Sequence, residues 1–159
     1  MRILIVSDTH RMHRNLEDVL EKVGEIDEMI HLGDVEGGDD YINAFVDCPV
    51  HFVAGNNDFW SGLPQEDHLF IRGHHIFITH GHYYHVSRGY EKLAAAAREK
   101  NADIVMYGHT HRPLHVEEDG LLILNPGSIS LPRQEGRRPS YMIMEIDEQG
   151  KVDVKIQYM

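Results

Sequence analysis

The chain has 159 residues, of which 42% are hydrophobic and 26% are charged, and its formal net charge is −11. A length of this order fits a single domain, 1–159, and is sufficient to bury a full hydrophobic core. The acidic excess argues against non-specific binding through a basic surface, so we expect no stable complex with nucleic acid.

Strands and helices are predicted to alternate over the first two thirds of the chain. The helix at 13–23 carries an apolar stripe at positions i, i+3, i+4 and i+7, and Gly24 is a natural stop. Such alternation implies parallel strands joined by right-handed crossovers. The predicted strands are 2–7, 28–32, 50–54, 68–72, 75–79 and 103–107, and the predicted helices are 13–23, 39–46 and 87–100.

The last third of the chain is predicted to be all β, with strands at 113–118, 121–124, 140–147 and 152–157. Turn sequences at 118–120 and 148–150 indicate two hairpins, which predict an antiparallel sheet. The expected fold class is α/β, an α+β sandwich of two facing mixed β-sheets flanked by helices.

Five of the predicted apolar strands end in side chains that bind metals. In an extended segment residues i and i+2 point the same way, so Asp8 and His10 converge on one spot. The same spacing applies to His109 and His111. Ligand sites of open sheets lie at the ends of strands, so we expect one polar site to be assembled there. Its members are Asp8, His10, Asp34, Asn56, His80, His109 and His111.

This set of ligands favours two metal ions over one. Carboxylates can bridge two cations, whereas a neutral imidazole nitrogen binds only one, and the set contains two carboxylates. Two ions about 3.5–4 Å apart would clamp the attacking and leaving oxygens of a displacement at phosphorus. Bound cations also allow an acidic protein to attract a small anionic substrate.

The same motifs resemble, in order and over nearly the whole chain, the signature of the calcineurin-like metallophosphoesterase superfamily. The segments that match this signature are Asp8-x-His10, Gly33-Asp34, Gly55-Asn56-x-Asp58, His80 and Gly108-His109-x-His111. The Asn125–Ser128 turn ahead of Ser130–Arg133 is similar to the compact microbial phosphodiesterase branch.

The resemblance implies how the ligands divide between two divalent metal ions. Manganese is the expected metal, with iron, zinc, nickel and cobalt as alternatives, and Asp34 would bridge both ions. The first ion would be bound by Asp8, His10, Asp34 and His111. The second would be bound by Asp34, Asn56, His80 and His109.

The resemblance further implies a phosphodiesterase that hydrolyses small organic phosphodiesters through attack of a metal-bridging hydroxide. The candidate catalytic residues are Asp34, Asn57 and His82, and the candidate substrate-binding residues are Arg11 and Asn57. Asn57 stands where the superfamily usually has a histidine, and an amide cannot deliver a proton to the leaving group. Good leaving groups should therefore be favoured.

Two other positions depart from the family pattern. Gly37 stands where the family commonly has an acidic residue, so the sequence lacks a carboxylate that would support the ligands. Arg11 stands where a glycine is common, and its planar guanidinium suits a phosphate oxygen.

Several alternatives stay open at this stage. A catalytically weak protein-interaction scaffold is one, because a eukaryotic retromer subunit resembles the same branch. A phosphomonoesterase is another. His82 and His85 either line the substrate pocket or close the loop after His80, and His31 is expected to be a hydrogen-bonded core residue. Both a monomer and a homo-oligomer are compatible with the sequence.

The compartment is expected to be the cytoplasm. The N-terminal apolar run has only four residues before Ser7, too few for an export signal. No apolar stretch approaches the roughly 20 residues of a membrane span, so no membrane partner is expected. A single cysteine, Cys48, excludes an internal disulfide.

Overall fold

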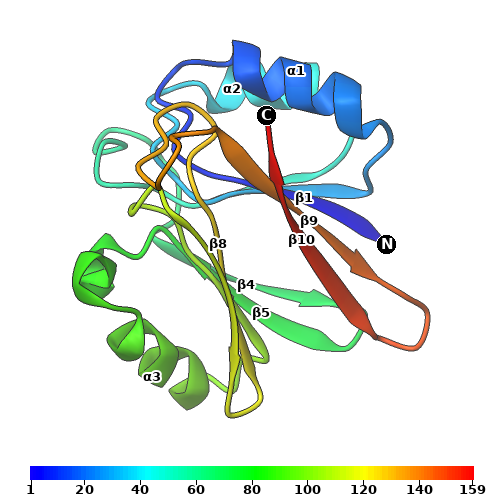
Figure 1. The fold of residues 1–159 in the computed structure, drawn as a ribbon, viewed down its shortest axis with the longest axis vertical. Helices are drawn as coiled ribbons and strands as arrows, with labels where there is room; N and C mark the ends of the chain where they lie inside the picture. Colours follow the sequence, from blue (N-terminus) through cyan, green and yellow to red (C-terminus); the bar gives the residue numbers. More distant parts are fainter.

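The computed structural model describes residues 1–159 and consists of two five-stranded sheets that face each other across a shared core. Helices cover the outer face of each sheet (Figure 1). The first sheet is covered by α1 (Arg14–Val23) and α2 (Asp39–Phe45), and the second by α3 (Glu91–Glu99). The predicted fold class, two facing mixed sheets flanked by helices, is confirmed.

The first sheet has the strand order β10-β9-β1-β2-β3 and mixes parallel with antiparallel pairs. Strands β1, β2 and β3 are parallel and are connected through α1 and α2. The C-terminal hairpin β9-β10 pairs antiparallel with β1, which places Ile3 opposite Met144. The bounds are β1 (Arg2–Val6), β2 (Glu28–His31), β3 (Val50–Phe52), β9 (Ser140–Ile146) and β10 (Val152–Tyr158).

The second sheet has the order β4-β5-β6-β8-β7, with parallel pairs at its centre and antiparallel pairs at both edges. The prediction that the late hairpins form an antiparallel sheet of their own is wrong. The hairpin β7-β8 pairs with β6, whereas β9-β10 pairs with β1, because each of those parallel strands has a free edge. The bounds are β4 (Glu66–Ile71), β5 (His74–Thr79), β6 (Ile104–Met106), β7 (Pro113–Glu118) and β8 (Leu121–Pro126).

The predicted helix at 87–100 begins too early. The chain first makes two short 3-10 turns, His82–Tyr84 and Val86–Arg88, and α3 starts only at Glu91. Gly89 lies between them with φ 141°, a value that no residue of a right-handed helix adopts. By contrast, α1 follows its apolar stripe and ends at Gly24, as predicted.

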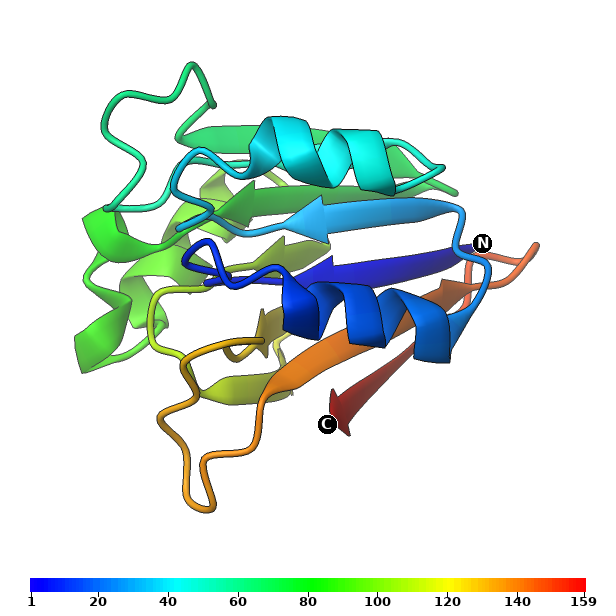
Figure 2. The ribbon, with the colours of Figure 1, turned by 90° about the horizontal axis from the view of Figure 1, so that it is seen from above.

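The core lies on both faces of the first sheet. Ile3 and Ile5 of β1 pack between the two sheets, whereas Leu4 and Val6 pack under α1 and α2. This alternation follows from the two-residue period of a strand. Strands β1 and β2 point to the same end of the sandwich, where loops of distant sequence gather (Figure 2). None of the helices combines the length and the apolar composition that a membrane crossing requires.

Candidate metal centre

The loops after five strands bring their polar residues to one end of the sandwich. The strands are β1, β2, β3, β5 and β6, and their order in the two sheets places these loops side by side. Four of the predicted ligands are almost completely buried there: Asp8, Asp34, His80 and His111. The other three, His10, Asn56 and His109, are partly exposed, so the site opens to solvent on one side.

The backbone is strained at these ligands. Asp8, His10, Asp34, His109 and His111 all have φ between 46° and 66°, a region that residues other than glycine rarely adopt. Such conformations cost free energy and persist where the surrounding structure enforces them, commonly at functional sites.

Two glycines make room for the central carboxylate. Gly33 has φ 95°, and a Cβ placed there would lie 2.7 Å from the backbone nitrogen of Gly55. A Cβ placed on Gly55 would lie 2.1 Å from Asp34 Oδ1. The two loops therefore approach so closely that only glycine fits at either position.

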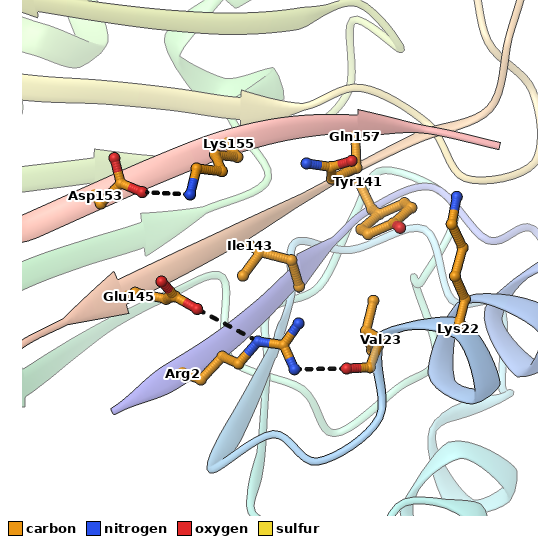
Figure 3. Close-up of a pocket in the computed structure, with 9 residues that line it drawn as sticks. All are labelled: Arg2, Lys22, Val23, Tyr141, Ile143, Glu145, Asp153, Lys155 and Gln157. Carbon is orange, nitrogen blue, oxygen red and sulfur yellow. Dashed lines mark hydrogen bonds and ion pairs between the residues drawn. The ribbon is translucent and has the colours of Figure 1, made fainter.

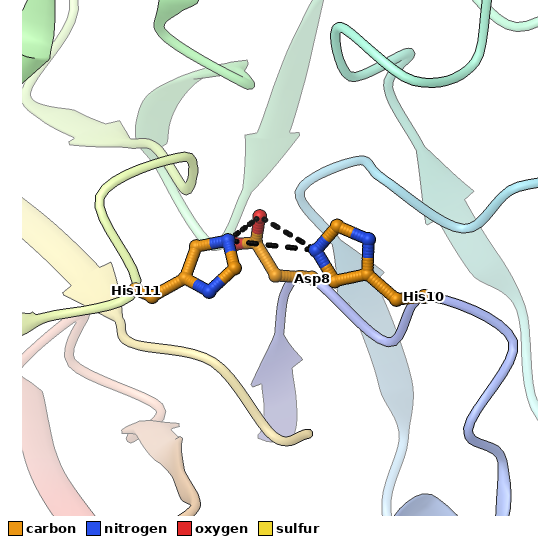
Figure 4. Close-up of side chains that lie close together, drawn as sticks. All are labelled: Asp8, His10 and His111. Carbon is orange, nitrogen blue, oxygen red and sulfur yellow. Dashed lines mark hydrogen bonds and ion pairs between the residues drawn. The ribbon is translucent and has the colours of Figure 1, made fainter. Parts of the chain in front are cut away.

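Asp8, His10 and His111 form one compact group (Figure 4). The two Nε2 atoms of His10 and His111 face each other at 3.5 Å. Asp8 Oδ1 lies 3.0 Å from His111 Nε2 and 3.9 Å from His10 Nε2. Two ligands held about 2.1 Å from one tetrahedral metal ion would be separated by about 3.4 Å, so these spacings suit a shared cation.

Asp8, Asp34 and His80 form a second group. Asp34 Oδ2 lies 3.6 Å from His80 Nε2 and 3.8 Å from His10 Nε2, which places it between the two groups. Asn56 Oδ1 adds an oxygen 3.2 Å from His80 Nε2 and 2.8 Å from His109 Nδ1. All seven residues proposed as ligands from the sequence thus lie in one cluster.

Three of the histidines turn Nε2 toward the cluster and hold Nδ1 against a fixed acceptor. The Nδ1 atoms of His10, His80 and His111 lie 2.6–2.7 Å from the Glu36 carboxylate, the Leu32 carbonyl and the Leu131 carbonyl, respectively. These oxygens can only accept, so Nδ1 must donate, and Nε2 is the nitrogen left to bind a cation. This is the arrangement of a metal ligand whose outer nitrogen is held by a protein acceptor.

The charge state of the cluster also fits a cation. Burial alone would raise the pKa of Asp8, but His111, His80 and the Ser7 hydroxyl lower it below its ordinary value. Asp8 is therefore ionised, and its buried Oδ1 has no well-aligned hydrogen bond. Carboxylates combined with imidazoles suit divalent first-row metals, so the residues present fit such ions.

The predicted substrate residues lie at the rim of the cluster. Asn57 donates from its backbone nitrogen and from Nδ2 to the two oxygens of Asp34, each at 2.8 Å. The Arg11 guanidinium donates to the Glu36 carbonyl and is exposed. Both residues line a cavity of about 540 Å³ together with the fully exposed Trp60. Asn57 therefore orients the Asp34 carboxylate and also faces the side of the cluster that is open to solvent.

Of the two histidines after His80, only His82 stays near the cluster. Its ring centroid lies 5.4 Å from that of His80 and 6.2 Å from that of His109, and its buried Nδ1 has no partner. Burial, with His80 and His109 nearby, lowers the pKa of His82 to about 4. His85 is exposed in a left-handed conformation between the two 3-10 turns, so it closes the loop.

His31 lies below the cluster and is fully buried. Its Nδ1 accepts from the Gly33 N–H at 3.2 Å, and its Nε2 faces Thr9 Oγ1 at 3.1 Å. Burial lowers the pKa of His31 to about 4. The prediction of a hydrogen-bonded core histidine is confirmed.

Two carboxylates important to the site had been given no role from the sequence. Glu36 orients His10 through its carboxylate. It therefore supplies the supporting carboxylate that the sequence seemed to lack, because Gly37 stands where the family commonly has an acidic residue. Asp58 is buried and accepts from the backbone nitrogens of Val35, Glu36 and Gly55, which joins the loops after β2 and β3. The position of Asp58 in the Gly-Asn-x-Asp motif was the available signal, whereas Glu36 had none.

The turn at Asn125–Ser128 fixes two further loops of the site. Asn125 Nδ2 donates to the Gly108 carbonyl at 2.9 Å, and Ser128 Oγ donates to the Asp8 carbonyl at 2.9 Å. The turn therefore holds the loops after β1 and β6 together.

A separate hollow of about 280 Å³ lies beside the end of α1 and over β9 and β10 (Figure 3). Four of its five charged residues form two ion pairs: Arg2 lies 3.6 Å from Glu145, and Lys155 lies 2.9 Å from Asp153. Arg2 begins β1, at the opposite end of that strand from Asp8. The hollow therefore contributes nothing to the candidate metal centre.

Residues 1–149 match the family model of the calcineurin-like phosphoesterase superfamily domain. A probable metallophosphoesterase of Bacillus subtilis is 33% identical over 148 residues, covering 92% of this chain and 85% of that protein. A phosphodiesterase of Methanocaldococcus jannaschii is 31% identical over 150 residues, covering 80% of this chain and 83% of that protein.

Solved structures of similar proteins have the same fold. A predicted phosphoesterase from Streptococcus pneumoniae has a TM-score of 0.80 at 32% identity, covering 99% of this chain and 97% of that one. Vps29 from Entamoeba histolytica, complexed with zinc, has a TM-score of 0.79 at 26% identity and covers 99% of both chains.

Proposed function

Because the chain belongs to the calcineurin-like phosphoesterase superfamily, we propose that it is a metal-dependent phosphodiesterase acting on small organic phosphodiesters. The observation that carries the proposal is the shared orientation of His10, His80 and His111, whose Nδ1 atoms are held by acceptors while their Nε2 atoms face Asp8 and Asp34. A cluster that only stabilised the fold would not need three imidazoles turned toward two carboxylates.

Two divalent ions, with manganese as the first candidate, would lower the pKa of a coordinated water and offset charge on the phosphoryl oxygens. Asp8, His10, Asp34 and His111 would hold one ion, and Asp34, Asn56, His80 and His109 the other. Asn57 holds both oxygens of Asp34 and so orients the shared carboxylate. Arg11 and Asn57, at the rim, bind the phosphoryl oxygens.

The protonation chemistry of the site favours esters with good leaving groups. Asn57 cannot donate a proton to a leaving oxygen, and the low pKa of His82 leaves that imidazole neutral at pH 7. General acid assistance is worth about 10²–10⁴-fold, so esters whose leaving group departs without a proton should react best. The preference for a diester over a monoester is supported by the likeness to a relative that is itself named a phosphodiesterase.

The test is hydrolysis of bis-p-nitrophenyl phosphate after chelation and return of manganese. Activity should be absent in the stripped protein, return with manganese, and exceed that on p-nitrophenyl phosphate. Asp34→Asn should lower kcat by at least about 10²-fold, since it removes the shared charge. Asp153→Asn, an exposed carboxylate on β10, is the matched control. Metal-independent inertness of folded protein contradicts the proposal.

The likeness to Vps29 supports a second candidate, a protein-interaction scaffold built on the same fold. In that case the loaded protein would bind metal yet hydrolyse neither ester. Substituting the ligand residues would then lower the metal content of a protein that has no esterase activity to lose. This result distinguishes the scaffold from the enzyme.

A further inference from the structure

A second cavity of about 360 Å³ borders the loop that follows β6. Its polar lining comprises two arginines, Arg112 and Arg133, and three residues with hydroxyl groups, Ser87, Tyr107 and Thr110. No carboxylate lines it, although the chain has 26 acidic residues against 15 basic ones. The composition of this cavity is therefore opposite to that of the chain as a whole.

The cavity is directly connected to the candidate metal centre through the backbone. Thr110 lines the cavity, and its two neighbours in the sequence, His109 and His111, belong to the ligand cluster. The backbone nitrogen of Arg133 donates to the His111 carbonyl at 3.0 Å. Both arginines are thus fixed to the loop that presents the ligands.

The two guanidinium groups are free to bind a ligand. Arg112 and Arg133 are exposed, and neither side chain forms an ion pair or a hydrogen bond within the chain. Guanidinium groups bind phosphate oxygens through paired, charge-assisted hydrogen bonds. The other cavity at the metal centre differs, because Glu36, Asp39 and Asp40 line it beside Arg11.

We propose that the cavity of Arg112 and Arg133 binds a second, terminal phosphate group of the substrate. The natural substrate is then a phosphodiester that carries a further phosphate, oriented so that this group lies over Thr110 and away from Asp39 and Asp40. This inference rests on the proposed function, because it specifies the substrate class of the same site.

The test compares two matched substrates with manganese-loaded protein, both with a p-nitrophenolate leaving group: thymidine 5′-(p-nitrophenyl phosphate) and its 3′-phosphorylated form. The wild-type protein should have a kcat/KM about tenfold higher for the phosphorylated ester, the size expected for a charged hydrogen-bonded contact. Arg112→Gln and Arg133→Gln should each raise KM for the phosphorylated ester at least about threefold, because two guanidinium groups share this advantage. Both should leave kcat for the phosphorylated ester, and all constants for the unphosphorylated ester and bis-p-nitrophenyl phosphate, within twofold.

Arg72→Gln, at the turn between β4 and β5, is the control and should change nothing. Equal constants for the two thymidine esters would overturn the proposal. An equal loss on the unphosphorylated ester in the arginine variants would also overturn it, because the arginines would then act on the reacting phosphate.

Failure of the proposed function is distinguishable from failure of this inference. If neither thymidine ester is hydrolysed, metal-free protein is titrated with inorganic pyrophosphate while the arginine Nε–H signals are followed by NMR. Selective shifts of the Arg112 and Arg133 signals, absent in the double variant, support the phosphate site even in an inactive protein. Unchanged signals overturn it.

Discussion

Glu36 lies outside the ligand set but acts on it directly, because its carboxylate fixes the ring of His10. Glu36→Gln leaves an acceptor at this position but removes the charge that makes His10 a stronger ligand. We expect manganese affinity to fall about 10–100-fold. Competition with a chelator of known affinity measures this directly.

Asp40→Asn is the matched control for that change. Asp40 lines the same cavity and carries the same charge, but it makes no contact with a ligand. If both variants lose affinity equally, the effect of Glu36 is a general effect of charge and its contact with His10 is unimportant.

His31 gives the fold a defined pH dependence. Its folded pKa of about 4 lies below the ordinary value of 6.5, so the unfolded chain binds more protons between these values. The stability contributed by neutral His31 is therefore complete above pH 6.5 and is lost as the pH falls toward 4. Protonation would also put a second donor against the Gly33 N–H.

His31→Asn keeps an acceptor for Gly33 and removes the titration. Between pH 7 and pH 4.5 the wild-type protein should lose about 2 kcal/mol more of its unfolding free energy than this variant. Urea unfolding at both pH values measures the difference. Parallel losses in the two proteins would mean that His31 is already protonated or solvated in the folded state.

The ligands themselves could be predicted because each follows an apolar strand and belongs to a recognisable motif. The supporting residues could not, since their roles depend on how loops meet. Glu36 reaches His10 only because the loops after β1 and β2 adopt left-handed backbone conformations, and no local pattern specifies that geometry. Likewise, nothing in the sequence brings Arg112 and Arg133 into one cavity.

At the scale of the elements, the approach of the loops after β2 and β3 is set by glycine. Gly55→Ala would put a methyl group 2.1 Å from Asp34 Oδ1, so the carboxylate or the loop must move. We expect a loss of about 1–3 kcal/mol of stability and a manganese affinity at least tenfold lower. Calorimetric unfolding and metal titration measure the two effects.

Gly62→Ala provides the control in the same loop, between β3 and β4. A Cβ on Gly62 would meet no atom within 4 Å, so stability and metal binding should both stay as in the wild-type protein. A Gly55→Ala protein with unchanged metal affinity would show that the position of Asp34 tolerates displacement.

The elements also show where sequence periodicity succeeds. In α1 the apolar stripe and the terminal glycine specify both the face and the end of the helix. The predicted start of α3 was wrong because an apolar stripe defines the buried face of a helix but not the residue at which the helix begins. The stripe consists of Tyr90, Leu93, Ala94 and Ala97. The conformation of Gly89 decides that point, and glycine adopts many conformations with similar ease.

At the scale of the whole molecule, the assignment of hairpins to sheets could not be read locally. Both late hairpins have the same kind of turn sequence, yet one joins the first sheet and the other joins the second. The parallel strands β1 and β6 each have a free edge, so only the assembled fold decides which hairpin pairs with which strand.

The same assembly concentrates ionisable groups from five separate loops at one end of the sandwich. Asp8 and Asp34 are both buried there, and Asp8 is held ionised by neighbouring imidazoles. Buried charges without full compensation are costly, and a cation between them would relieve that cost. Metal binding should therefore stabilise the entire molecule, because the ligands connect both sheets.

The size of this effect can be stated. An ion at 100 times its dissociation constant adds about 2.7 kcal/mol to the unfolding free energy. For a protein of this length, each kcal/mol raises Tm by roughly 2–4 °C, so saturating manganese should raise Tm by about 5–10 °C per bound ion. Calorimetry with manganese and with EDTA in the same buffer tests this. Asp34→Asn should lose most of the shift, whereas Asp153→Asn should retain it. An identical Tm with manganese and with EDTA would mean that these seven residues do not form a metal site, because a cation that bound the folded protein alone could not leave its stability unchanged.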